Sequence, residues 1–159
     1  NGLLISFEND SNFELNSAVI SPEFSSVLST FYPRLMAIVY KYKYSVSELR
    51  IEGHTDSSVR PFDSKLSGYL FNTQLSQDRS RNVMEYALNL PPILGNTKYL
   101  EWSYKNVTAH GMSSSNRILD TSGAEDNAAS RRVEFRLRTR AEEQLLGLVS
   151  EITGDGDQR

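Results

Sequence analysis

The feature that most constrains the fold lies in the last third of the chain, where apolar and charged side chains alternate from Arg131 to Thr139. Val133, Phe135 and Leu137 form the apolar set, and Arg132, Glu134, Arg136 and Arg138 form the charged set. Because successive side chains of a strand point to opposite faces, this pattern predicts a strand in a sheet with one buried face and one face in water. Such a sheet needs helices to cover its apolar face.

The first segment with helical spacing begins at Ser21-Pro22-Glu23, which supplies an N-cap, a proline at the first helical position and an acid in the first turn. The apolar side chains that follow predict one buried face; they are Phe24, Val27, Leu28, Phe31, Leu35, Ile38, Val39 and Tyr42. We expect Pro33 to kink or split this helix, because proline lacks a backbone donor and crowds the preceding turn.

The remaining predicted elements are helices over residues 70–88 and 97–104 and strands over 3–8, 49–54 and 107–112. Their order predicts an α+β two-layer sandwich, in which helices cover one face of a mixed four-stranded sheet. We expect one domain, residues 1–140, followed by an amphipathic helix at 141–150 and a disordered tail at 151–159.

The composition excludes several classes of function. The chain has 159 residues and a net charge of −3, which argues against binding to nucleic acid. It has no cysteine, so disulfides, thiolate metal sites and a cysteine nucleophile are excluded. No apolar run approaches the roughly 20 residues that cross a bilayer. Because the chain opens at Asn1 without an initiator Met, we expect it to be part of a longer protein.

Polar segments on the predicted strands and on the second helix are candidates for a functional site. On that helix one stripe holds Asn72, Leu75, Ser76, Arg79 and Val83. Arg79 has a planar fork that suits a carboxylate, and Asp56, at the end of a predicted strand, has a charge that suits an ammonium. If the two meet, they would recognise the amino and carboxyl groups on one carbon of an amino acid.

Three of these segments resemble, in order, the signatures of the OmpA-like C-terminal family, which is also found in peptidoglycan-associated lipoproteins and flagellar stator proteins. The signatures are a Gly-His-Thr-Asp loop, a Tyr-Asn-x-x-Leu-Ser-x-x-Arg helix and an Asn-Arg-Arg-Val-Glu strand. Here they read Gly53-His54-Thr55-Asp56, Phe71-Asn72-Thr73-Gln74-Leu75-Ser76-Gln77-Asp78-Arg79 and Ser130-Arg131-Arg132-Val133-Glu134. The resemblance spans about residues 3–139 and implies a non-catalytic domain, without a cofactor or metal, that binds peptidoglycan.

The resemblance also implies roles for individual residues. Asp56 would bind the ammonium and Arg79 the carboxylate of diaminopimelate in the wall's stem peptide. The other candidates for ligand binding are Asn72, Leu75, Thr55 and Phe71, with Asn9, Asp10 and Arg131 as further members of the pocket. The parent protein would be membrane-attached in the periplasm of a Gram-negative-type bacterium. A stator-type subunit is the nearer resemblance, and a homodimer is one expectation.

The chain departs from the family pattern around the pocket. Phe71 stands where the family has Tyr, Ser130 where it has Asn and Val59 where it has Gly, and the stretch from Asp56 to Asn72 is longer than usual. These changes predict a remodelled rim. Either Arg131 or Arg132 is expected to orient the pocket through an ion pair, and the sequence leaves open which one.

Two other functions stay open. A wall hydrolase or metallohydrolase would use His54, Asp56 and His110, but these residues have no recognisable catalytic or ligand spacing, and both histidines are expected to bond to backbone at strand ends. Alternatively, the domain is a protein-interaction module that has lost wall binding, which Phe71 and the long loop would favour.

Overall fold

The computed structural model describes residues 3–8, 12–14, 16–58 and 64–141. Its sheet has four strands, β1 (Leu3–Glu8), β2 (Val46–Gly53), β3 (Val107–Gly111) and β4 (Arg132–Thr139), in the order β1-β4-β2-β3. β4 runs antiparallel to both of its neighbours, whereas β2 and β3 are parallel. The predicted mixed sheet is confirmed, and the alternating segment is one of its two central strands.

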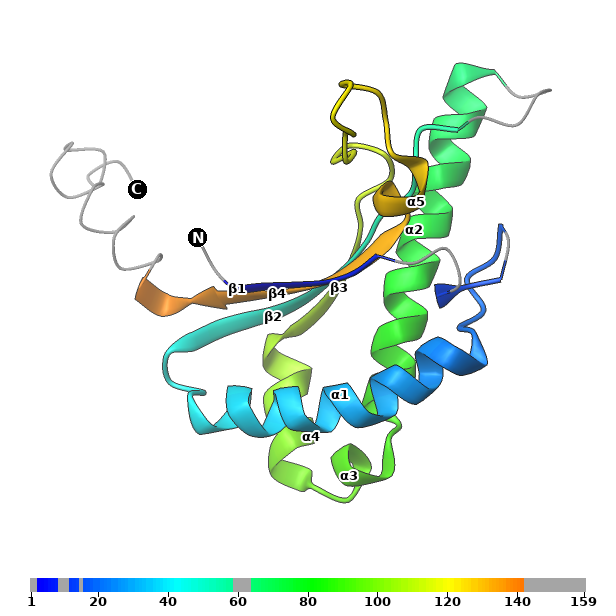
Figure 1. Cartoon of the computed structure of the whole chain (residues 1–159). Coiled ribbons are helices and arrows are strands. Elements are labelled where there is room, and N and C mark those ends of the chain that lie inside the picture. The colour runs from blue at the N-terminus through cyan, green and yellow to red at the C-terminus, as the bar shows by residue number, and fades with distance from the viewer. Residues whose placement is uncertain (1–2, 9–11, 15, 59–63, 142–159) are drawn as a thin grey trace, which may run out of the picture.

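Helices cover the apolar face of this sheet, which confirms the α+β sandwich. α1 (Pro22–Lys41) and α4 (Thr97–Asn106) lie below the sheet in Figure 1, and α2 (Lys65–Leu88) packs along β2 and β3. Two short helices, α3 (Pro91–Leu94) and α5 (Asn127–Ser130), do not follow from the sequence pattern. α3 begins where the second helix was expected to stop, because prolines are tolerated in the first turn of a helix.

α1 is one continuous helix, so the expectation that Pro33 splits it is wrong. Pro33 removes a single backbone donor. The side chains around it, Tyr32, Leu35 and Met36, are at most 4% exposed and hold this turn in the core. The N-terminus follows the prediction, since the Ser21 side chain accepts a hydrogen bond from the backbone N–H of Phe24.

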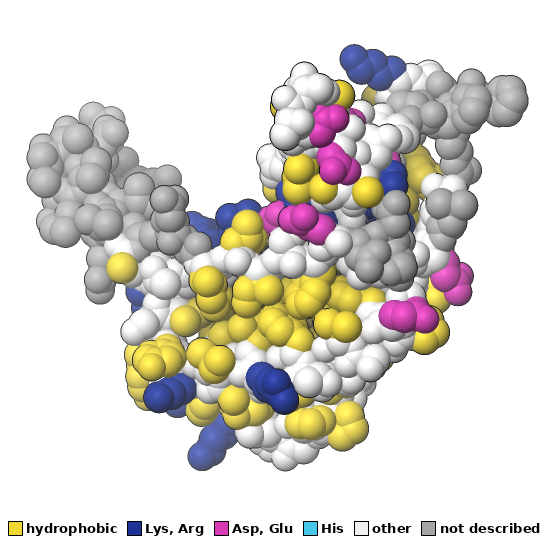
Figure 2. Space-filling model, viewed as in Figure 1, with side chains coloured by type: hydrophobic (Ala, Val, Ile, Leu, Met, Phe, Trp, Pro, Cys, Tyr) yellow, Lys and Arg dark blue, Asp and Glu magenta, His cyan; other side chains and the backbone are white. Residues whose placement is uncertain are grey.

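The face that α1 buries is narrower than its apolar spacing predicts. Val27, Ile38 and Tyr42 are 46%, 58% and 54% exposed, while Tyr32 and Met36 take places in the core. The sheet covers only part of a wide apolar stripe. Figure 2 shows apolar side chains gathered at the surface between α1 and β1.

Two glycines allow α2 to lie unusually close to the ends of β2 and β3. A Cβ atom on Gly53 would lie 2.3 Å from the carbonyl oxygen of Ser76, and one on Gly111 would lie 2.5 Å from the backbone nitrogen of Gln77. The Gln77 side chain accepts a hydrogen bond from Gly111 N–H at 2.8 Å and donates to the Ala109 carbonyl at 3.3 Å. This close approach brings the α2 motif to the loop that follows β2.

The face of the sheet opposite the helices is less exposed to solvent than the alternation predicts. Arg136 and Arg138 have side chains that are 36% and 41% exposed, but Arg132 and Glu134 are only 6% and 5% exposed as residues. The segment 112–130 lies over this end of the sheet (Figure 1), and Arg132 donates to the Asn116 carbonyl in it. The connection between β3 and β4 therefore buries charges expected to be in water.

No helix among the described residues is both long and apolar enough to cross a membrane. Apart from Ala141, the helix predicted at 141–150 and the tail predicted at 151–159 lie outside the described residues.

Candidate functional site

The loop after β2, His54 to Ser58, is fastened at its start by backbone hydrogen bonds. His54 N–H donates to the Arg132 carbonyl and Thr55 N–H to the Ser113 carbonyl, both at 2.9 Å. His54, Thr55 and Asp56 are 1%, 3% and 6% exposed. The predicted Thr-Asp loop is therefore a buried, ordered element that joins β4 and the segment after β3.

Asn72 on α2 ties the helix to this loop. Its side-chain nitrogen donates to the carbonyl oxygens of Asp56 at 3.2 Å and Ser58 at 3.3 Å. One helical turn later, the hydroxyl of Ser76 accepts a hydrogen bond from Ser113 N–H at 3.0 Å. The structure thus brings together segments that the sequence shows far apart, and it places Asn72 as a residue that shapes the loop.

The carboxylate of Asp56 is bonded through both oxygens. Oδ1 accepts a hydrogen bond from Ser58 N–H at 3.0 Å, and Oδ2 forms an ion pair with the guanidinium of Arg131. Arg132 turns the other way and pairs with Glu134 on the sheet. Of the two arginines, Arg131 is therefore the one that pairs with Asp56.

Arg79 lies further along α2 and is 7% exposed. Its Nε donates to the Ser17 carbonyl at 2.9 Å, and its guanidinium carbon lies 4.8 Å from the centroid of the Phe13 ring. Both contacts come from the segment before α1. They fix the direction of a long, charged side chain that would otherwise extend into water.

The remaining residues that the sequence predicts for ligand binding differ in their burial and position. Leu75 and Phe71 are partly buried on α2. Thr55 is buried, and its hydroxyl has no hydrogen-bond partner among the described residues. Asn9 and Asp10 lie outside the described residues.

Glu125 is a member of the site that sequence reasoning missed. Its carboxylate accepts hydrogen bonds from the backbone N–H of Ser57, at 3.0 Å, and from the Ser57 hydroxyl. These contacts connect residues that are 68 positions apart. Glu125 lies in a polar stretch without periodicity, so no local signal marks it.

Both histidines lie at strand ends, and the backbone N–H of His54 bonds to the Arg132 carbonyl as expected, but the rings of both residues approach side chains. His54 Nε2 lies 3.4 Å from Glu134 Oε2 and 3.8 Å from Glu52 Oε2, and His110 Nε2 lies 3.1 Å from the hydroxyl of Thr108. In the described part of the chain, the three residues close enough to share a metal are Glu52, His54 and Glu134, not His54, Asp56 and His110.

Arginines already balance both carboxylates of this group. Arg132 donates to Glu134 at 2.6 Å, and Arg136 donates to Glu52 at 3.1 Å and to Glu134 at 3.2 Å. A divalent ion would add positive charge beside two guanidinium groups, which disfavours it. We interpret the cluster as a structural ion-pair network.

Because of this network, we expect the free energy of unfolding to decrease at acid pH. Burial raises the pKa of Glu134, but the contact with His54 and the hydrogen bond and charge of Arg132 outweigh it and lower the pKa to about 2. The pKa of Glu52 is also lowered, mainly by His54 and Arg136 against burial. Both groups titrate higher when unfolded, so their stabilisation is present above about pH 4.5 and is lost as the pH falls toward 2.

We therefore expect the free energy of unfolding, measured in urea at a series of pH values, to fall steeply below pH 4.5. A Glu134→Gln protein removes the titrating group, so its curve should be flatter over the same range. An equally steep curve for this variant would show that other carboxylates cause the loss.

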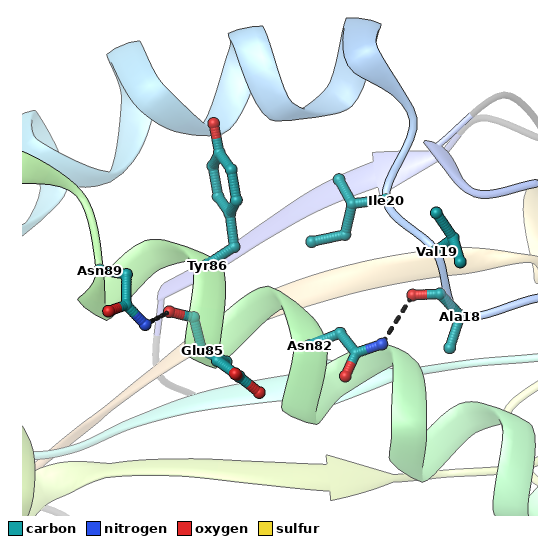
Figure 3. Close-up of a pocket in the computed structure, with 7 residues that line it drawn as sticks. All are labelled: Ala18, Val19, Ile20, Asn82, Glu85, Tyr86 and Asn89. Carbon is teal, nitrogen blue, oxygen red and sulfur yellow. Dashed lines mark hydrogen bonds between the residues drawn. The ribbon is translucent and has the colours of Figure 1, made fainter.

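A shallow groove lies on α2 beyond Arg79 (Figure 3). It is lined by Ala18, Val19, Ile20, Asn82, Glu85, Tyr86 and Asn89. Asn82 donates to the Ala18 carbonyl at 2.9 Å, one residue after the carbonyl that Arg79 holds. The hydroxyl of Tyr86 donates to the Ser25 carbonyl, so the Tyr86 side chain is bonded to α1. The hydrogen bond from Asn82 therefore helps to hold the segment that positions Arg79.

Known proteins resemble this chain in sequence and in fold. No protein-family model matches the chain. The Zorya protein ZorB from Escherichia coli is 34% identical over 139 residues, which cover 87% of this chain and 58% of ZorB. The chain thus spans little more than half the length of this curated relative.

Solved structures share the fold at lower sequence identity. The periplasmic domain of Helicobacter pylori MotB has a TM-score of 0.62 and 19% identity, over 99% of this chain and 94% of that one. The cell wall anchor of the T6SS from Pseudomonas aeruginosa has a TM-score of 0.54 and 23% identity, over 86% and 80%. The peptidoglycan-associated lipoprotein from Burkholderia pseudomallei has a TM-score of 0.50 and 15% identity, over 84% and 89%. None of these names describes an enzyme. The chain is thus similar in sequence to ZorB and shares the fold of the periplasmic domain of MotB.

Proposed function

We propose that this domain binds peptidoglycan without chemical turnover, and that it anchors a membrane-attached protein to the cell wall in the periplasm. Among the proteins with this fold, one is described as a cell wall anchor and another as a peptidoglycan-associated lipoprotein. The relationship to ZorB supports a stator-type parent protein. In a homodimer, two such domains would double the contacts with the wall and raise the overall avidity.

The observation that carries the proposal is the pair of buried charges, Asp56 and Arg79, on two elements that Asn72 and the close glycine contacts join. Both residues are nearly fully buried, at 6% and 7% exposed, so the surrounding protein fixes the directions of their side chains before a ligand binds. Asp56 would bind an ammonium and Arg79 a carboxylate of the ligand. Thr55, a buried hydroxyl without a partner among the described residues, would add a hydrogen bond.

A ligand group that would give both charges a partner has an amino and a carboxyl group on one carbon. The side chain of diaminopimelate ends in this way, whereas the lysine of other stem peptides ends in an ammonium alone. A site that bonds a carboxylate discriminates strongly against a ligand that lacks one, because its polar groups are left unpaired.

We expect the diaminopimelate-type stem peptide to bind at least about tenfold more tightly than the lysine-type peptide, or about 1.4 kcal/mol. Titration calorimetry with both peptides at matched, low salt measures the difference. Equal affinities would mean that the site recognises the sugar or the peptide backbone and not the end of the diaminopimelate side chain.

Co-sedimentation with purified diaminopimelate-type sacculi tests binding itself. The folded domain should pellet with the sacculi and release no soluble fragments. A folded domain that stays in the supernatant would favour the protein-interaction module, and reproducible release of muropeptides would favour an enzyme.

A further inference from the structure

We infer that the C-terminal end of α1 and the turn after it form a second binding surface, which contacts the headgroups of an anionic lipid bilayer. This basic end surface consists of Arg34, Ile38, Lys41, Tyr42, Lys43 and Tyr44. It is separate from the candidate site, and its assignment rests on the proposed function only in that the parent protein is attached to a membrane.

The apolar and aromatic side chains of this surface are open to solvent. Ile38, Tyr42 and Tyr44 are 58%, 54% and 81% exposed. Ile38 lies about one helical turn before Tyr42, the C-cap of α1, so the two side chains lie on the same side of the helix. Exposed apolar groups that gather on one face mark a contact with another protein or with a membrane.

The charges beside these side chains are all positive. Residues 24–47 include Arg34, Lys41 and Lys43 and no Asp or Glu, although the whole chain has a net charge of −3. Figure 2 shows Lys and Arg side chains among apolar ones along the left part of α1, whereas the Asp and Glu side chains in this view lie over other parts of the molecule. The partner of this surface is therefore anionic.

An anionic bilayer fits this combination better than another protein does. A second copy of the surface would bring like charges together, which opposes association. Tyr, Lys and Arg suit the interface of a bilayer, because each joins an apolar ring or stem to a polar end. Lys43 shows this arrangement, with its Nζ 4.3 Å from the ring centroid of Tyr40 and 5.1 Å from that of Tyr44. Lipid phosphates would bind the cations while Ile38 enters the boundary with the acyl chains.

This surface lies at the other end of the sheet from the Asp56 loop. β2 begins at Val46, directly after the turn, and ends at Gly53, shortly before Asp56. Its 8 residues span roughly 25 Å. A bilayer bound at the basic end surface would therefore leave the Asp56 loop accessible to the wall.

Co-sedimentation of the whole chain with lipid vesicles tests the inference. Vesicles of phosphatidylethanolamine and phosphatidylglycerol should bind the domain at low salt, and vesicles of phosphatidylcholine alone should not. Lys41→Gln removes one exposed cation and should weaken binding about fivefold at low salt, with a smaller effect as salt is added. Ile38→Ser removes an apolar contact and no charge, so it should weaken binding about fivefold at every salt concentration.

Arg81→Gln is the matched control, because it removes a cation from α2, at a side chain that is 63% exposed, and should bind vesicles as the wild type does. Equal binding to both kinds of vesicle, or unchanged binding in Lys41→Gln and Ile38→Ser, would overturn the lipid assignment. A wild-type domain that ignores vesicles but forms a dimer in analytical ultracentrifugation, lost in Ile38→Ser, would identify the surface as a contact between copies.

Sedimentation with sacculi keeps this result apart from the proposed function. Lys41→Gln and Ile38→Ser should both pellet with sacculi as the wild type does, because Asp56 lies at the far end of β2. A wild-type domain that binds anionic vesicles and no sacculi would refute wall binding and uphold the lipid surface, and the reverse result would do the opposite.

Discussion

Replacing Arg79 by alanine is expected to weaken binding to diaminopimelate-type sacculi by about 2–5 kcal/mol, a loss of roughly 30-fold to several thousand-fold. Truncation leaves the ligand's carboxylate without its cation at a position that is only 7% exposed, where water cannot replace the lost partner well. Quantitative co-sedimentation over a range of sacculus concentrations measures the change.

Two further variants separate binding from folding. Arg79→Met keeps an apolar stem against the Phe13 ring and removes the charge, so it should lose binding with less disturbance of the segment before α1. Arg81→Ala removes a charge two residues away, at a side chain that is 63% exposed, and should bind as the wild type does. A folded Arg79→Met protein that sediments like the wild type would refute the assignment of Arg79.

The largest expected effect on stability comes from Glu134→Ala, which should lower the free energy of unfolding by about 3–5 kcal/mol at neutral pH. Glu134 and Arg132 have side chains that are each 6% exposed and are joined by a hydrogen bond of 2.6 Å. Removing the carboxylate leaves a buried guanidinium, and the neighbouring His54, without this anion. Urea unfolding followed by circular dichroism measures the loss.

Glu85→Ala is the matched control, because this glutamate pairs with Arg81 on the helix surface, where its side chain is 60% exposed. Exposed pairs of this kind contribute at most about 1 kcal/mol. A loss in Glu134→Ala no larger than in the control would mean that water reaches the network, contrary to its burial.

Local physical chemistry in the sequence determined the elements of the fold. The alternation along β4 requires a sheet with two different faces, because side chains of a strand point to opposite sides. Ser21 and Pro22 set the start of α1, since a hydroxyl that accepts a backbone N–H and a proline both suit the first turn. The motifs on β2 and α2 also predicted the residues of the candidate site, although their roles in binding stay predictions.

Only the tertiary structure decided which charges are buried and which side chains pair. The sequence could not separate Arg131 from Arg132, because neighbouring residues of an extended segment point in opposite directions and the register decides which one meets Asp56. Glu125 reaches Ser57 across 68 positions, a distance over which no periodicity carries information. Burial of Glu134 depends on where the segment 112–130 lies, and exposure of Val27 and Ile38 depends on how far the sheet extends. These outcomes depend on tertiary contacts, which local spacing does not encode.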